Sequence, residues 1–353
     1  MTDRTAAADH LAGYPDIVAA ACATGRRLSR DELESRRTEG ERAAEAGLPL
    51  RGLIRDHLAA AQTLRPAAPS SSDALLSVVE QAVDAFLEGY ERAQQQAVRQ
   101  EEAARREFID DLLYGGSDLG RLAERAERFG LRLSQAHAVA VAAGPEPYGD
   151  GFRVARGIET AVLTRFPGRQ ILLTTKDGRL ICVAPGDQPD VLAFFAKQAY
   201  AATDGGRVAI GRSHPGAGGV VHSYEEALSA LDIAARMGLD GPVLHAVDLL
   251  VYPVLTRDRQ AMADLVESTL GPLRTARGGA QPLIDTLTAY FDSGCVATEA
   301  ARRLSLSVRA LTYRLERIHS LTAADPADPA TRYTLQTAVI GARLLGWPGD
   351  ESE

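Results

Sequence analysis

Apolar residues recur at steps of three and four over most of the chain, a spacing that places them on one face of an α-helix. The longest such pattern runs from Ser72 to Leu113 and alternates the two steps as a heptad repeat does. Two interpretations stay open: a dimer stalk, favoured by the length and the polar run at 101–107, or an amphipathic helix packed on its own domain. The positions of the predicted dimer seam are Leu76, Val79, Val83, Phe86, Tyr90, Ala93 and Ala97.

Residues 1–71 have an Ala-rich helical pattern, which predicts an all-helical N-terminal domain. Ser29 and Glu32 have the spacing of a capping box, in which each side chain satisfies a backbone amide of the other at a helix start. His57 lies on a predicted helix of this domain. It could bind haem if the fold were globin-like, but a lone histidine without a second ligand is more often an ordinary core or surface residue.

Between residues 116 and 253 short apolar runs alternate with helical patterns, which predicts an α/β domain. Residues 136–143 predict a strand. A β-hairpin follows at 170–184 and turns at Lys176-Asp177-Gly178, since Asp-Gly is a favoured hairpin turn. The remaining predicted elements are helices at 151–166, 190–202 and 223–237 and strands at 207–211 and 242–247.

Two short helical patterns separated by a tight turn occupy residues Val296–Ile318. Ala300 and Ala301 are small enough to let two helices cross closely, as a helix-turn-helix requires. Ser305 and Ser307 both qualify as N-caps of the second helix. The apolar positions expected to pack together are Val296, Ala297, Ala300, Ala301 and Leu304 in the first helix and Val308, Leu311, Leu315 and Ile318 in the second.

The opposite face of the second helix, residues 307–319, is polar and basic, so it could enter a DNA major groove. Arg309 lies in the first turn, where a recognition helix commonly contacts bases. Arg302, Arg314 and Arg317 fit phosphate contacts better. The predicted DNA-binding residues are Arg302, Ser307, Arg309, Ala310, Thr312, Tyr313, Arg314 and Arg317.

This segment resembles the C-terminal DNA-binding domain of the PucR/CdaR family of bacterial transcriptional regulators. The matching residues are Ala300, Leu304, Leu311, Tyr313-Arg314-Leu315 and Arg317-Ile318, then Asp325–Asp328, Arg332-Tyr333 and Leu335. Where the family usually has His, Asn and Thr at the start of the reading helix, this chain has Ser307, Arg309 and Ala310. The resemblance therefore implies the binding mode and not a particular DNA sequence.

The element order at 116–253 resembles the GGDEF-like domain at the centre of these regulators, most clearly at Val208–Arg212 and Ser223–Ala227. The N-terminal helices resemble the sensor-like domain of many actinobacterial members, which is related to stress-signalling regulators. The expected fold is therefore multidomain α and α/β, with a ferredoxin-like or cyclase-like middle. The expected boundaries are 1–71 (helical sensor-like domain), 72–115 (long coiled-coil-like helix), 116–253 (GGDEF-like domain), 254–280 (connecting helix and linker) and 281–347 (helix-turn-helix domain).

Charge is distributed unevenly along the chain. The formal net charge is −8, whereas Val296–Ile318 carries five Arg against only Glu299 and Glu316. Binding to polyanions is thus expected from one module and not from the whole molecule. The three isolated cysteines, and the lack of a membrane-length apolar run or signal-peptide core, predict a reduced, cytoplasmic protein.

Residues for enzyme chemistry are scarce. A diguanylate cyclase needs several carboxylates at its central hairpin to hold magnesium, but here Asp177 stands alone beside Lys176. The histidines have no metal-ligand spacing, and no phosphate-loop or hydrolase motif is present. We therefore expect no catalytic residues, no metal and no cofactor.

The expected function is a dimeric DNA-binding transcriptional regulator. Its expected partners are double-stranded operator DNA, a second copy of the chain and a small-molecule effector. Two alternatives stay open: a nucleotide-binding or divergent cyclase-like sensor, and a stress-signalling scaffold with a vestigial DNA-binding domain. Salt-dependent DNA binding would separate the scaffold from the regulator.

Overall fold

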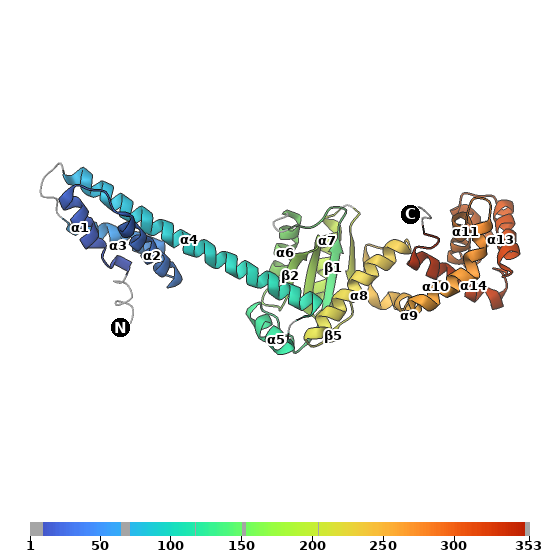
Figure 1. Ribbon diagram of the computed structural model, residues 1–353. Coiled ribbons are helices and arrows are strands. Elements are labelled where there is room, and N and C mark those ends of the chain that lie inside the picture. Colours follow the sequence, from blue (N-terminus) through green and yellow to red (C-terminus); the bar gives the residue numbers. More distant parts are fainter. Residues whose placement is uncertain (1–9, 65–70, 117, 150–152, 204, 350–353) are drawn as a thin grey trace. The chain divides into compact units, whose positions relative to one another are not determined.

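The structure is a computed structural model that describes residues 10–64, 71–116, 118–149, 153–203 and 205–349. It divides the chain into two compact units, residues 1–107 and 108–353 (Figure 1). Within the described ranges, no helix is both long and apolar enough to span a lipid bilayer.

The described part of the first unit is helical, as predicted. Helices α1 (Tyr14–Thr24), α2 (Arg30–Glu45) and α3 (Leu50–Thr63) pack along the first half of α4 (Ser71–Tyr114) (Figure 1). The predicted capping box starts α2. The backbone N–H of Glu32 donates to Ser29 Oγ at 3.3 Å, and that of Ser29 donates to Glu32 Oε2 at 2.8 Å.

Two glycines allow α2 and α4 to touch backbone to backbone. A Cβ atom on Gly40 would lie 2.0 Å from the carbonyl oxygen of Phe86, and one on Gly89 would lie 2.0 Å from that of Arg37. Beside this crossing, Arg37 Nε donates to Glu88 Oε2 at 2.7 Å. Any side chain at either glycine would force the helices apart, because backbone atoms cannot move out of the way as side chains do.

Helix α4 is continuous, as predicted, but most of its apolar seam is covered within the chain itself. The seam residues in the cores formed with α1–α3 are Val79, Phe86 and Tyr90, which are buried, and Val83, which is half-buried. Ala93 is half-buried, whereas Leu76 is 67% exposed and Ala97 is exposed. The predicted dimer seam is therefore wrong for its central residues, because the preceding helices supply the apolar surface that a partner helix was expected to supply.

The second unit contains a mixed β-sheet with the strand order β2-β3-β1-β4-β6. The strands are β1 (Ala136–Ala143), β2 (Leu172–Lys176), β3 (Arg179–Pro185), β4 (Arg207–Ile210), β5 (His214–Pro215) and β6 (Val243–His245). The central strand β1 pairs antiparallel with β3, β4 and β5, with Val141 opposite Ile181, and β4 pairs parallel with β6. The β2–β3 hairpin turns at Asp177 and Gly178 as predicted, and their φ angles of 49° and 70° are those that a type I′ turn requires.

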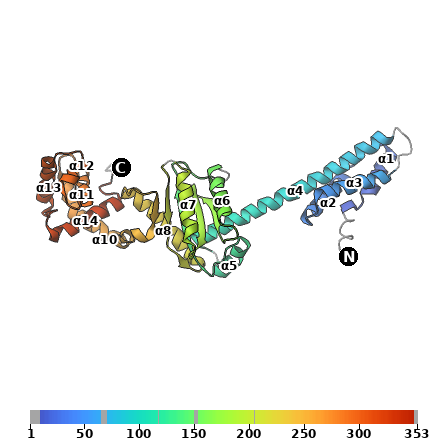
Figure 2. The same ribbon diagram turned by 180° about the vertical axis from the view of Figure 1, so that it is seen from behind.

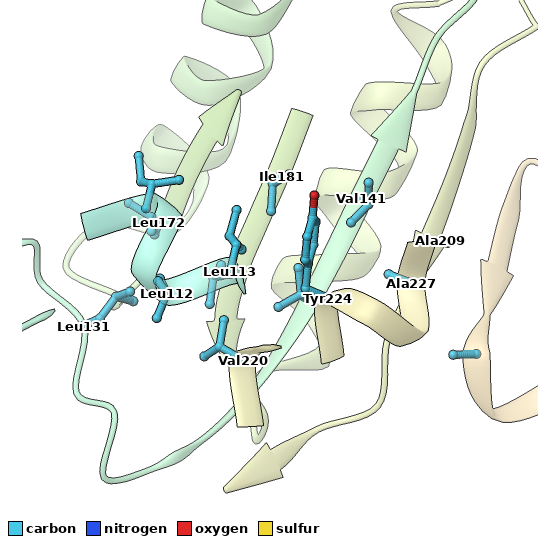
Figure 3. Close-up of a cluster of buried hydrophobic side chains, with 14 of the residues drawn as sticks. Leu112, Leu113, Leu131, Val141, Leu172, Ile181, Ala209, Val220, Tyr224 and Ala227 are labelled. Atoms are coloured by element: carbon cyan, nitrogen blue, oxygen red, sulfur yellow. The ribbon is translucent and has the colours of Figure 1, made fainter. Parts of the chain in front are cut away.

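The two faces of the sheet are covered by different helices. Val139 and Val141 of β1 point toward α8 (Ala217–Arg236), α5 (Leu119–Arg128) and the end of α4, in the core shown in Figure 3. The alternate residues, such as Ala140, point toward α6 (Arg153–Arg165) and α7 (Pro189–Ala201), which Figure 2 shows on the opposite face. The predicted order of helices and strands is confirmed, except that the short strand β5 was not predicted and α8 begins at Ala217 rather than at residue 223.

The C-terminal helices share one core. They are α10 (Arg259–Leu270), α11 (Gln281–Asp292), α12 (Ala297–Arg303), α13 (Val308–Thr322) and α14 (Pro329–Leu345). The 3-10 helices η2 (Ala246–Leu249) and η3 (Gly271–Thr275) and the short α-helix α9 (Val251–Leu255) join the elements around them. Residues 254–280 are thus more than the expected connecting helix, because Met262, Val266 and Leu270 of α10 are buried against the other C-terminal helices.

Candidate DNA-binding site

The turn between α12 and α13 is fixed by backbone hydrogen bonds. Leu306 N–H donates to Ala301 O at 2.8 Å and Ser305 N–H donates to Arg302 O at 3.1 Å, the pair of bonds that forms a Schellman motif. Ser305 occupies the left-handed position of this motif, with φ 53°. Ser307 caps α13, since its hydroxyl accepts from Ala310 N–H at 3.2 Å. Of the two serines predicted as caps, only Ser307 is one, and Ser305 ends the preceding helix.

The inner side of the helix pair is packed as predicted at its centre. Ala300, Ala301, Leu311 and Ile318 are buried in the C-terminal core. The prediction is wrong at Val308, which is 45% exposed, and at Val296, which is also exposed. Val308 begins α13 and Val296 is the N-cap of α12, so both lie beyond the crossing point where the helices cover each other.

The outer side of α13 presents an exposed stripe. Arg309 is exposed and Tyr313 is 62% exposed. Glu316 lies seven residues after Arg309 and is exposed on the same stripe. No described acidic side chain forms an ion pair with Arg309 or Arg317. We call Arg309, Tyr313 and Glu316 the α13 stripe.

The other predicted site residues lie at the edges of this stripe. Ser307 and Thr312 are exposed, Ala310 and Arg317 are half-buried, and Thr312 Oγ1 donates to Val308 O at 3.0 Å. Arg314 is half-buried and donates to Thr286 Oγ1 of α11 at 3.3 Å. The structure therefore places Arg314 as a link between α13 and α11.

Arg302 lies on α12 and is already paired. Its Nη2 donates to Glu299 Oε1 at 2.7 Å, and Arg303 Nε lies 3.7 Å from the same oxygen. The hydrogen bond from Arg302 lowers the pKa of Glu299 and raises the pKa of Arg302 itself. Both arginines are exposed and Glu299 is half-buried, so a DNA phosphate can compete with Glu299 for either arginine.

Three residues of the site were missed by the sequence reasoning: Glu316, Thr286 and Arg303, the last an exposed arginine next to Arg302. Glu316 places a carboxylate at the C-terminal end of the stripe, and its seven-residue spacing from Arg309 was the available signal. Thr286, buried on α11, holds Arg314, but nothing in the sequence connects residues so far apart.

In the hairpin of the middle domain, the carboxylate of Asp177 is hydrogen-bonded to the end of α4. The hydroxyl of Tyr114, at the end of α4, donates a hydrogen bond to Asp177 Oδ2, and Lys176 Nζ pairs with Asp110 Oδ1 at 2.6 Å. Burial, together with the bond to Asp177, raises the pKa of Tyr114. Among the described residues, no group of three or more His, Cys, Asp or Glu side chains has the arrangement of a metal site.

Two segments of the chain match known protein families. Residues 114–233 match the GGDEF-like domain, and residues 283–340 match the PucR C-terminal helix-turn-helix domain. An uncharacterized protein of Mycobacterium tuberculosis is 30% identical over 202 residues, which are 57% of this chain and 47% of that protein. The chain thus spans about half the length of the mycobacterial relatives that it matches.

Two proteins named for a regulatory function are also similar to this chain. The purine catabolism regulatory protein of Bacillus subtilis is 31% identical over 107 residues, which are 29% of this chain and 19% of that protein. The crystal structure of a regulator of polyketide synthase expression from Bifidobacterium adolescentis matches with a TM-score of 0.37 and 19% identity, over 69% of this chain and 94% of that chain.

Proposed function

We propose that this chain, a regulator of the PucR/CdaR type, binds double-stranded operator DNA with α13 and thereby controls transcription. The observation that carries this proposal is the exposed α13 stripe, on a capped helix within the segment that matches the PucR helix-turn-helix domain. A recognition helix needs a rigid base and a free outer face, and α13 has both.

The charges around the stripe suggest how the contacts are divided. Arg309, unpaired in the first turn, is the residue we assign to a guanine edge, because its guanidinium can donate two parallel hydrogen bonds there. Arg302 and Arg303 on α12 and Arg317 on α13 are assigned to phosphates. Glu316 can accept from the amino group of cytosine, which would make it a second base-reading residue.

We infer that two copies bind one operator, because helix-turn-helix proteins usually read two half-sites with a two-fold dimer. The covered seam of α4 moves the expected contact to the exposed stretch after Tyr90, which includes Ala97 and Val98. Sedimentation of the full chain would report the mass. A monomer at micromolar concentration, with or without DNA, would contradict this inference.

The middle domain, we infer, regulates without catalysis. Its one hairpin carboxylate, Asp177, accepts a hydrogen bond from Tyr114 and belongs to no group of three or more potential metal ligands among the described residues. Incubation with GTP or ATP and magnesium should give no cyclic product. Turnover that Asp177→Ala removes would favour the cyclase-like alternative.

A route from the middle domain to the DNA-binding helices supports a regulatory role. Ile233 and Met237 of α8 pack against Leu344 of α14, and Arg236 Nη1 donates to Leu344 O at 3.1 Å. A cavity of about 390 Å³ lies beside Ile233, large enough for the small-molecule effector that we expect. An effector bound there would touch the residue that contacts α14.

The test is DNA binding by the full chain at several salt concentrations. Fragments selected from the genome that encodes the protein should bind more tightly than scrambled duplexes, and the affinity should fall as salt rises, since phosphate contacts release counterions. Equal and weak binding of all duplexes would favour the scaffold alternative, in which the helix-turn-helix is vestigial.

A further inference from the structure

Four polar side chains are buried together in the first unit, far in sequence from the α13 stripe. They are His10, which precedes α1, Tyr14 on α1, Arg36 on α2 and His57 on α3, and none is more than 4% exposed. Polar groups are rarely buried to this extent unless hydrogen bonds satisfy them. We call these four residues the buried polar cluster.

Most of the polar atoms in the buried polar cluster have no partner among the described residues. The unpartnered atoms are both ring nitrogens of His10, the hydroxyl of Tyr14, Nε and Nη1 of Arg36, and Nε2 of His57. Arg36 does donate from Nη2 to Ala12 O, and Asp56 Oδ2 lies 3.5 Å from His10 Nε2 without hydrogen-bond alignment. Removing these atoms from water without replacing their hydrogen bonds destabilises the fold.

The side chains converge on His57. Its ring centroid lies 4.7 Å from that of Tyr14 and 5.7 Å from that of His10, and the ring of Phe86 lies 4.5 Å away on another side. Burial is the largest influence on both pKa values: it raises that of Tyr14 and lowers that of His57. The nearby charge of Arg36 opposes the shift at Tyr14 and adds to the shift at His57. The unpartnered atoms therefore belong to one place.

The protonation of His57 follows from its surroundings. Its Nδ1 lies 2.8 Å from Leu53 O, and a carbonyl oxygen can only accept, so Nδ1 carries the proton. Burial lowers the pKa of His57 to about 4, so the ring is neutral at pH 7 and Nε2 presents a lone pair. The buried polar cluster thus offers a cation with free N–H donors, a hydroxyl, an acceptor at His57 Nε2, and the two ring nitrogens of His10.

We propose that the buried polar cluster binds a small oxyanion that retains a proton, with hydrogen phosphate or a small phosphate monoester as the fitting chemistry. Its unprotonated oxygens would accept from Nε and Nη1 of Arg36 and from the hydroxyl of Tyr14. Its P–OH group would donate to Nε2 of His57. The proposal is independent of DNA binding, and it gives the helical N-terminal unit a ligand.

Asp56 is the acidic side chain that pairs with this cluster. Its side chain is 41% exposed and it lies on the His10 side, so its charge is partly screened by water. The charge of Glu39 also acts on Arg36, partly opposing the lowering of its pKa by burial. Glu39 is itself paired with another arginine, since its Oε1 accepts from Arg42 Nη1 at 2.7 Å. Neither carboxylate hydrogen-bonds to Arg36, whose charge remains without a hydrogen-bonded anion among the described residues.

The experiment is isothermal titration calorimetry of the full chain with inorganic phosphate, and with sulfate at the same ionic strength. Sulfate has the same shape but no proton at pH 7, so it cannot donate to His57 Nε2. Phosphate should bind saturably, one per chain, and at least about tenfold more tightly than sulfate. Absence of saturable heat, or equal affinity for the two anions, would overturn the proposal. If a small phosphate monoester bound more tightly than inorganic phosphate, the ligand would be a monoester rather than free phosphate.

Variants assign the binding to these residues. Arg36→Met should abolish phosphate binding while the ligand-free protein melts at the same or a higher temperature, because an unpaired buried charge is removed. Arg42→Met, on the same helix but exposed, is the matched control and should bind as the parent does. Tyr14→Phe should weaken phosphate binding several-fold, and this variant provides the test if Arg36→Met does not fold. If phosphate binding were unchanged in both Tyr14→Phe and Arg36→Met, the anion would bind elsewhere. Arg309→Ala should bind phosphate as the parent does, whether or not its affinity for DNA changes.

Discussion

Helices α4 and α13 both carry a regular apolar stripe with polar residues opposite, yet the structure uses the two helices differently. The central stripe of α4 is covered by α1–α3 of the same unit, and on its exposed side Arg92 forms ion pairs with Glu88 and Glu41. The outer side of α13 keeps Arg309 exposed, with no described acidic side chain paired to it. Periodicity thus shows which side of a helix is apolar, but not what covers it.

The largest expected effect tests the covered side of α4. Phe86→Ala should reduce the free energy of unfolding of the first unit by about 3–5 kcal/mol, because it removes a fully buried ring and leaves a cavity. Leu76→Ala, at an exposed position of the same predicted seam, should change it by less than about 0.5 kcal/mol. Hydrogen exchange on α1–α3 during chemical unfolding reports this unit separately. If Phe86→Ala instead dissociated a dimer and left the hydrogen exchange of α1–α3 unchanged, Phe86 would pack against a second chain, as the sequence predicted.

The sequence predicts the element order well because local signals determine it. The capping box at Ser29, the Asp177-Gly178 turn and the apolar run of β1 each depend on residues close together in the chain. Partners were less predictable. Helices α1–α3, and not a second chain, cover Phe86, and Thr286 holds Arg314. Both contacts join residues that are distant in sequence, so no local pattern indicates them.

At the candidate site, too, local features could be predicted from the sequence and long-range contacts could not. The stripe on α13 could be drawn from helical periodicity, and Arg309 and Tyr313 are exposed as expected. Val308 was misplaced, because the periodic pattern continues to the end of a helix even where no neighbour remains to cover it. The buried polar cluster joins residues from 10 to 57, and His57 alone gave no indication of its three companions.

A second test uses the close contact between α2 and α4. Gly89→Ala should destabilise the first unit by about 1–3 kcal/mol, because the new Cβ would lie 2.0 Å from Arg37 O. Gly52→Ala, in α3, is the matched control. Its Cβ would meet nothing closer than Pro49 Cγ at 3.9 Å, so it should be neutral or stabilise by about 0.5–1 kcal/mol. Equal effects of the two substitutions on hydrogen exchange would show that α2 and α4 do not touch.

The exposed side of α13 is tested by two arginines with different assigned contacts. Arg309→Ala should cost about 1–3 kcal/mol for the specific duplex and less for a scrambled one, since a base contact is lost. Arg317→Ala should weaken both duplexes alike and reduce the salt slope by roughly one, since a phosphate contact is lost. Titration of both variants with both duplexes measures this. If neither variant differs from the parent while the helices stay folded, α13 is not the reading helix.

The smallest expected effects concern the two serines that frame the turn before α13. Ser307→Ala should destabilise the C-terminal helices by about 1 kcal/mol, because Ala310 N–H loses its capping acceptor. Ser305→Gly should be neutral or stabilise by up to about 1 kcal/mol, because glycine adopts the left-handed conformation at φ 53° without the strain that a Cβ introduces. The opposite signs make the pair informative, since both substitutions remove a serine hydroxyl from the same turn. Thermal melting combined with hydrogen exchange at α12 and α13 would measure the difference. A loss of stability in Ser305→Gly equal to that in Ser307→Ala would mean that the Ser305 hydroxyl caps α13, which would contradict the turn described here.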